Sequence, residues 1–211
     1  PELIVNLANH LRAYDPGSGQ ELWNIDTDHG YATAPPILHD GIVYNISGEG
    51  HGRRCALAVR PGAVTEDQRI VWRIGGGKDG AYGVNCSAPV LTQGRLYWGS
   101  LAKVYSRLYG FYCVDPADGA LIYKQEDYKE LFASRRKEIY ASAFATEDHI
   151  YYVDRSGGTI VVAADEHWRV VAQNTTGDEA KGIRWHCPPV PTPTGQLLLR
   201  SDWGVHCIGG G

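Results

Sequence analysis

The chain has 211 residues, of which 43% are hydrophobic and 21% are charged, a composition that is ordinary for a globular protein and argues against disorder. Its 20 basic and 24 acidic residues give a formal net charge of −4, so electrostatics provide no reason to expect nucleic acid or an anionic membrane as partner. The apolar runs are only strand-sized, so no membrane span is predicted.

The first 26 residues predict three strands. One strand ends at Ala13-Tyr-Asp-Pro16, and after a turn the next begins at Glu21-Leu-Trp23. Apolar and aromatic residues on both sides of a turn rich in Gly and Pro are typical of antiparallel β-structure. The segment therefore predicts the last three strands of a four-stranded sheet.

A hairpin of one pattern then recurs four times. Each copy has a strand of small residues, a turn and a strand of β-branched, Leu and aromatic residues. The turn residues are Gly41, Gly94, Asp148 and Gly195, which are 53, 54 and 47 residues apart. This spacing is near the roughly 40–50 residues of one four-stranded propeller blade. The copies cover residues 34–44, 87–97, 142–151 and 188–198.

Two further strands complete each repeat. The third strand carries a small residue at an equivalent position in every copy, such as Ala58 and Cys113, and the fourth carries Trp23, Trp72 or Tyr123. We expect these three aromatic residues to pack one blade against the next. Four strands per repeat predict an all-β fold, a β-propeller of four-stranded antiparallel blades.

The repeat resembles that of the quinoprotein-like (PQQ-like repeat) propellers. The resemblance lies in the run from Tyr14-Asp-Pro to Trp23, followed by Ala34-Pro and Asp40-Gly-Ile-Val-Tyr44. That family includes quinoprotein alcohol dehydrogenases, an outer-membrane assembly lipoprotein and many non-catalytic proteins, so the resemblance implies a fold more firmly than a function. It also implies a periplasmic, extracellular or cell-surface location.

Members of this family close rings of seven or eight blades, whereas this chain predicts about four to five. We therefore expect a single partial propeller over residues 1–211, the C-terminal half of a longer member. Its partner would be the missing propeller half, supplied by an absent segment or by a second copy of the chain, or another protein. The expected blades cover residues 1–26 (incomplete), 31–74, 84–124, 139–173 and 185–211 (incomplete).

No catalytic residue, metal ligand or cofactor is predicted. The quinoprotein dehydrogenases hold PQQ with a Glu, Asn and Asp set around a cation, beneath a disulfide of adjacent cysteines. Here no matching Glu accompanies Asn85 and Asp79, and none of the cysteines are adjacent. PQQ and calcium therefore belong only to an alternative hypothesis, in which the chain is part of a PQQ-dependent dehydrogenase. The cysteines are Cys55, Cys86, Cys113, Cys187 and Cys207.

The loops that join each outer strand to the next innermost strand emerge on one face of a propeller, and loops on a rigid scaffold are where binding usually resides. Their Tyr, Arg, Trp and His content suits a protein or polar ligand. We expect a non-catalytic binding or scaffolding module that uses this face. The candidate residues are Tyr31, Tyr82, Asn85, Arg135, Arg136, Tyr140, Arg184, Trp185 and His186.

Two features of this face leave alternatives open. His186 is the only support for a propeller-hosted hydrolase or lyase, because a lone His without a carboxylate at fixed spacing is not a catalytic signature. Residues 126–138 form an insertion that reads either as a solvated loop or as a short helix. The alternative to a solvated loop is that Arg135, Arg136 and Lys137 project over the channel mouth to meet an acidic ligand or partner.

Overall fold

The computed structural model describes residues 1–27, 30, 32–48, 54–75, 87–100, 110–126, 131, 138–176 and 182–209. These residues form five antiparallel sheets that follow one another along the chain. The predicted all-β propeller fold is confirmed. The strands of the first two sheets are β1 (Leu3–Leu7), β2 (His10–Tyr14) and β3 (Glu21–Asp26), then β4 (Ile37–His39), β5 (Ile42–Gly48), β6 (Arg54–Val59) and β7 (Ile70–Gly75).

The remaining three sheets repeat the same strand order, with the last sheet containing three strands among the described residues. A one-turn helix, α1 (Glu66–Arg69), precedes β7. The strands are β8 (Val90–Thr92), β9 (Arg95–Ser100), β10 (Gly110–Val114) and β11 (Leu121–Gln125), then β12 (Phe144–Ala145), β13 (His149–Val153), β14 (Thr159–Ala163) and β15 (Val170–Asn174), and finally β16 (Val190–Pro191), β17 (Leu197–Arg200) and β18 (Val205–Ile208).

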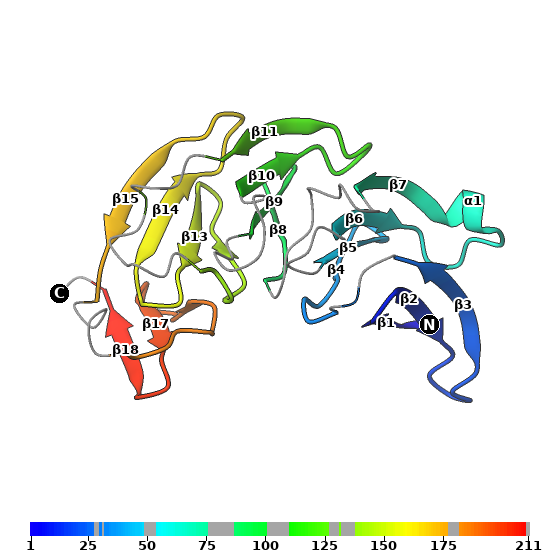
Figure 1. The fold of residues 1–211 in the computed structure, drawn as a ribbon, viewed down its shortest axis with the longest axis horizontal. Coiled ribbons are helices and arrows are strands. Elements are labelled where there is room, and N and C mark those ends of the chain that lie inside the picture. Colours follow the sequence, from blue (N-terminus) through cyan, green and yellow to red (C-terminus); the bar gives the residue numbers. More distant parts are fainter. Residues whose placement is uncertain are drawn as a thin grey trace.

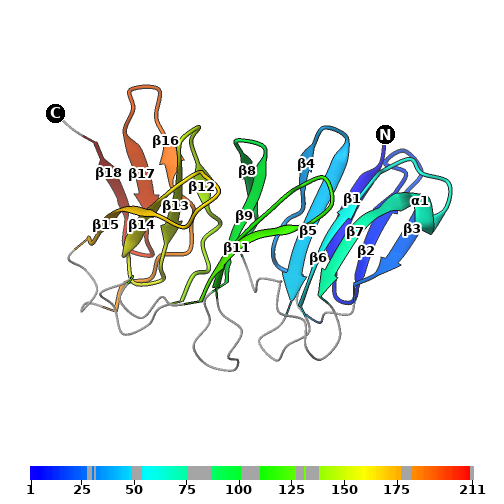
Figure 2. The same cartoon turned by 90° about the horizontal axis from the view of Figure 1, so that it is seen from above.

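The five sheets stand side by side in an arch whose two ends carry the two termini (Figure 1). The arch does not close into a ring. Seen from the side, the turns of the β4–β5, β8–β9 and β16–β17 hairpins lie on one face, and β5, β9 and β17 end on the opposite face (Figure 2). We call the first the hairpin face and the second the loop face. The loop face carries residues 138–140, 155, 184–186 and 200–202.

The hairpin turns follow from local chemistry. Asp40 and Gly41 have φ of 47° and 74°, and Gln93 and Gly94 have φ of 49° and 66°. Two successive residues with positive φ form the type I′ turn, whose twist matches that of the flanking strands and which glycine adopts at little cost. The glycines at positions 41 and 94 therefore set the register of β4 with β5 and of β8 with β9.

The core lies between consecutive sheets. All five residues of β10 and all five of β14 are buried, so these strands read as continuous apolar runs rather than as alternating patterns. A strand that packs on both of its faces has no solvent side to make polar. One apolar cluster, which includes Ile46, Ala58 and Trp98, fills the space between the second and third sheets, and comparable clusters lie at the other three junctions.

Trp72 links the second sheet to the third. Its Nε1–H donates to the Pro116 carbonyl at 2.8 Å, and the ring packs on the turn that precedes β11. Gly119 in that turn has a φ of 74°, and a Cβ built there would lie 2.8 Å from the Trp72 ring. Trp72 therefore covers a surface of the neighbouring sheet that only glycine leaves open.

Trp23 and Tyr123 occupy the same strand position in other sheets. Trp23 is 7% exposed, and its Nε1–H donates to the Glu2 carboxylate at 2.9 Å. Tyr123 lies against Trp168, with ring centroids 6.1 Å apart, beside the fourth sheet. Burial raises the pKa of the Tyr123 hydroxyl.

Candidate binding site

Four segments that are distant in the sequence are joined by backbone hydrogen bonds at the junction of the fourth and fifth sheets. The Arg155 N–H donates to the Glu138 carbonyl at 2.7 Å, and the Trp185 N–H donates to the Arg155 carbonyl at 3.1 Å. Trp185 in turn forms an isolated β-bridge with Ser201. Because hydrogen-bonded backbone is held in place, side chains on these segments have defined positions.

The Trp185 side chain anchors this junction from inside. It is 1% exposed and packs with Ala141, Val153 and Leu199, and its ring centroid lies 4.7 Å from that of His206. Trp185 therefore belongs to the core between the two sheets. Its neighbours along the chain, Arg184 and His186, point toward solvent on the loop face because successive strand residues alternate sides.

Arg155 is the centre of a polar network. Its Nη1 lies 2.7 Å from Oε2 of Glu138, a carboxylate whose side chain is only 8% exposed. Its guanidinium carbon lies 4.6 Å from the centre of the Tyr140 ring, a cation–π contact, and its Nε–H donates to Nε2 of His186 at 3.1 Å. Buried charges are retained where they are paired in this way, so Arg155 and Glu138 lock one conformation.

His186 is held as a neutral ring. Burial lowers its pKa, and the positive charges of Arg155 and Arg184 lower it further, against smaller opposing effects of Asp202 and Glu138. Since Nε2 accepts from Arg155, the proton of the neutral ring resides on Nδ1. The Tyr140 and His186 rings are 5.6 Å apart. His186 is thus a fixed hydrogen-bond donor, and a base whose lone pair accepts from a guanidinium is a poor proton acceptor for catalysis.

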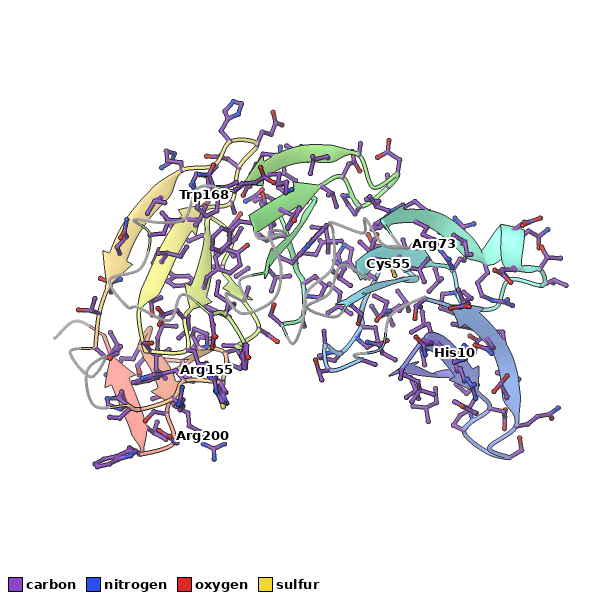
Figure 3. The ribbon with its side chains drawn as sticks, viewed as in Figure 1. His10, Cys55, Arg73, Arg155, Trp168 and Arg200 are labelled. Carbon is purple, nitrogen blue, oxygen red and sulfur yellow. The ribbon has the colours of Figure 1, made fainter. Side chains whose placement is uncertain are left out.

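A surface hollow of about 290 Å³ lies next to His186. Asp202 accepts the Arg184 backbone N–H on Oδ1 at 3.0 Å, which fixes the carboxylate at the rim. Arg184 and Arg200 form no ion pair with any residue that the structure describes. Arg155 and Arg200 are both drawn at the end of the arch that the last sheet forms (Figure 3). The hollow is lined by Arg184, His186, Cys187, Arg200, Ser201 and Asp202.

The structure brings together three of the residues expected on this face, Tyr140, Arg184 and His186. Trp185 is beside them in the chain but buried. The other five expected residues lie outside the described residues, as does most of the insertion. They are Tyr31, Tyr82, Asn85, Arg135 and Arg136.

Sequence reasoning missed Glu138, Arg155, Arg200 and Asp202. A signal for Arg155 was present, because it lies two residues after the end of the second strand of its blade. In an antiparallel blade the end of the second strand and the start of the first lie on the same face. The turns after second strands therefore belong to the loop face together with the loops that lead into first strands.

Cys113, Cys187 and Cys207 are free thiols, and the Cys55 thiol donates to the Thr27 carbonyl at 3.2 Å. Cys55 and Cys113 are buried, and burial raises the pKa of Cys113 to about 12. Cys187 is half-buried and Cys207 is exposed. Within the described ranges, no three His, Cys, Asp or Glu side chains gather as a metal-binding group, and no helix there has the length and hydropathy to cross a membrane.

No protein-family model matches the sequence, and no curated protein matches it. Solved structures do match. BamB from Moraxella catarrhalis aligns at 11% identity with a TM-score of 0.62, over 98% of this chain and 53% of BamB. A quinohemoprotein alcohol dehydrogenase from Comamonas testosteroni aligns at 13% identity with a TM-score of 0.63, over 94% of this chain and 42% of the dehydrogenase. The C-terminal domain of Pseudomonas aeruginosa PilY1 aligns at 13% identity with a TM-score of 0.61, over 94% of this chain and 52% of the PilY1 domain.

These neighbours share the PQQ-like β-propeller fold, so the fold implied by the sequence repeat is confirmed. The chain spans about half the length of the solved structures that it matches. At such low identity the likeness establishes the fold, and one scaffold of this kind supports unrelated activities. Function therefore has to be argued from the residues of the loop face.

Proposed function

We propose that this PQQ-like propeller chain is a non-catalytic binding or scaffolding module that holds a protein partner through its loop face. The observation that carries the proposal is the rigid Glu138–Arg155–His186 network beside a surface hollow. A binding surface gains affinity when its side chains are already ordered, because less conformational entropy is lost on association.

The chemistry of the surface supports binding rather than turnover. Arg and Tyr, which are enriched at protein interfaces, occur here together as Arg155 stacked on Tyr140. His186 contacts a guanidinium, and none of the described carboxylates forms a hydrogen bond with it that would orient it as a general base. The same arrangement in a hydrolase would need the His to accept a proton at the nitrogen that Arg155 already occupies.

A phage-displayed library of random twelve-residue peptides tests this proposal. Peptides are selected on the immobilised chain, and their binding to the His186→Ala variant is then measured. The control is His39→Ala, because His39 is also exposed but lies at the β4–β5 turn on the hairpin face. We expect most selected peptides to lose binding to the first variant and to keep it with the second. Peptides that bind both variants equally well would place recognition elsewhere and overturn the proposal.

We further propose that additional propeller blades pack against the terminal sheets. Large apolar side chains are exposed there, with Leu3 at 54%, Val190 at 53% and Val205 at 65%. The matched structures are about twice as long as this chain, and propeller sheets normally shield one another's apolar faces. Sedimentation velocity of the chain across a concentration series, with Val190→Ser and Val205→Ser as a paired variant, tests this. Self-association that the variant abolishes would identify a second copy as the occupant.

A monomer that binds no hydrophobic dye at these sheets would contradict such packing.

The family resemblance also leads us to propose a periplasmic or cell-surface location, which fractionation of cells that express the full gene product would test. Recovery of the protein only with the cytoplasmic fraction would refute it.

A further inference from the structure

The hollow beside His186 has an unbalanced charge. Arg184 and Arg200 contribute two guanidinium groups, and among the described residues of the lining Asp202 contributes the only carboxylate. His186 is uncharged near neutral pH because its pKa is lowered. Arg155 adds no net charge, since Glu138 neutralises it at 2.7 Å. The hollow therefore carries an excess of positive charge that no described residue neutralises.

The donors around the hollow outnumber the acceptors. A guanidinium group carries five N–H donors and no acceptor, and the Nδ1–H of His186 is a further donor. The Asp202 oxygen Oδ1 is already used by the Arg184 backbone. A ligand that satisfies this set must supply acceptors and negative charge, and a carboxylate does both with a geometry that matches the arginine fork.

We propose that this hollow binds a carboxylate side chain of an acidic segment in a partner protein, with Arg184 and Arg200 as the charged contacts and His186 as a neutral donor. The inference rests on the proposed function, because it names what the loop face recognises. A protein segment is favoured over a small free acid because the hollow opens to solvent beside His186, which contacts Tyr140 and Arg155, and flanking residues of a peptide would lie on that surface.

A labelled synthetic peptide, acetyl-Gly-Glu-Glu-Glu-Gly-amide, is the direct probe, and its binding is followed by fluorescence anisotropy. Its isosteric control replaces each Glu by Gln. We expect Arg184→Gln and Arg200→Gln each to weaken binding of the acidic peptide by about tenfold, as expected for loss of a charged hydrogen bond. Arg60→Gln is the matched variant, since Arg60 is exposed and follows β6 on the hairpin face. It should leave binding unchanged.

Asp202→Asn provides a change of opposite sign. Asparagine keeps an Oδ1 acceptor for the Arg184 N–H but removes the negative charge at the rim. We expect this variant to bind the acidic peptide several-fold more tightly and to unfold at the same urea concentration as the wild type. Raising the salt concentration should weaken binding in both proteins, because screening reduces attraction between exposed charges.

The outcomes separate the two proposals. Equal affinity for the Glu and Gln peptides, with sensitivity to His186→Ala, would overturn carboxylate recognition and leave the loop face as a binding surface. Binding of the acidic peptide that neither arginine variant changes would overturn the assignment to this hollow. Free succinate or inorganic phosphate that competes at the same concentration as the peptide would show that a small anion, and not a protein segment, is the ligand.

Discussion

Replacing Gly119 by alanine tests how the sheets pack on one another. Two costs add at this position. The φ of 74° is a left-handed conformation, which costs a residue with a Cβ about 1–2 kcal/mol. The new Cβ would also lie 2.8 Å from Trp72 Cδ2 and 2.9 Å from Ile74 Cδ1, and such overpacking typically costs about 1–3 kcal/mol. We expect Gly119→Ala to lower the free energy of unfolding by about 2–5 kcal/mol.

Two other glycines separate these costs. Gly19 and Gly62 have the same φ of 74°, and a Cβ at either would meet nothing within 4 Å. Gly19→Ala and Gly62→Ala should therefore lose only the conformational part, about 1–2 kcal/mol. The free energies are obtained from urea unfolding followed by tryptophan fluorescence and circular dichroism, with coincidence of the two probes as the test of two-state behaviour.

A second substitution isolates the contact itself. Trp72→Leu removes the ring that the Gly119 Cβ would meet but keeps the contact with Ile74 Cδ1, so in that background the added alanine should cost less than in the wild type and still more than at Gly62. If Gly119→Ala destabilises the wild type by the same amount as Gly62→Ala, within about 0.5 kcal/mol, Trp72 does not pack on the neighbouring sheet as described.

Three further predictions concern single side chains. Because the pKa of His186 is lowered in the folded protein, the unfolded chain takes up this proton at higher pH than the folded one. The free energy of unfolding should therefore fall as the pH drops below 6.5, and it should fall less in His186→Gln. A His186 ring that titrates by NMR at or above pH 6.5 would contradict this. Iodoacetamide should modify the exposed Cys207 rapidly and Cys113 only on unfolding, because burial raises the Cys113 pKa to about 12. Peptide mapping that finds both cysteines modified in the native protein would refute the burial of Cys113. Trp72→Phe should lower the free energy of unfolding by about 0.5–1.5 kcal/mol, because the Pro116 carbonyl loses the indole donor and keeps only the longer bond from the Tyr44 hydroxyl. An unchanged urea midpoint would argue against the indole bond.

More of the fold than of the candidate site could be predicted from the sequence. The fold was accessible because a repeated hairpin with Gly41, Gly94 and Gly195 at its turns encodes local structure, and the repeat length then selects the propeller. The site was accessible only in part. Tyr140, Arg184 and His186 were expected because they lie in loops before first strands, but their common partner Arg155 was not.

The amino-acid sequence by itself determined the strands, their turns and the stacking of like sheets, since strand periodicity and turn chemistry depend on neighbouring residues. The tertiary structure alone decided which polar groups meet. Arg155 contacts Glu138 and His186, which are 17 and 31 residues away, because the docking of the fourth sheet on the fifth brings three separate turns to one point. It also decided that Trp185 faces inward while Arg184 and His186 face solvent, because the side that a strand residue takes depends on which surface its neighbour covers.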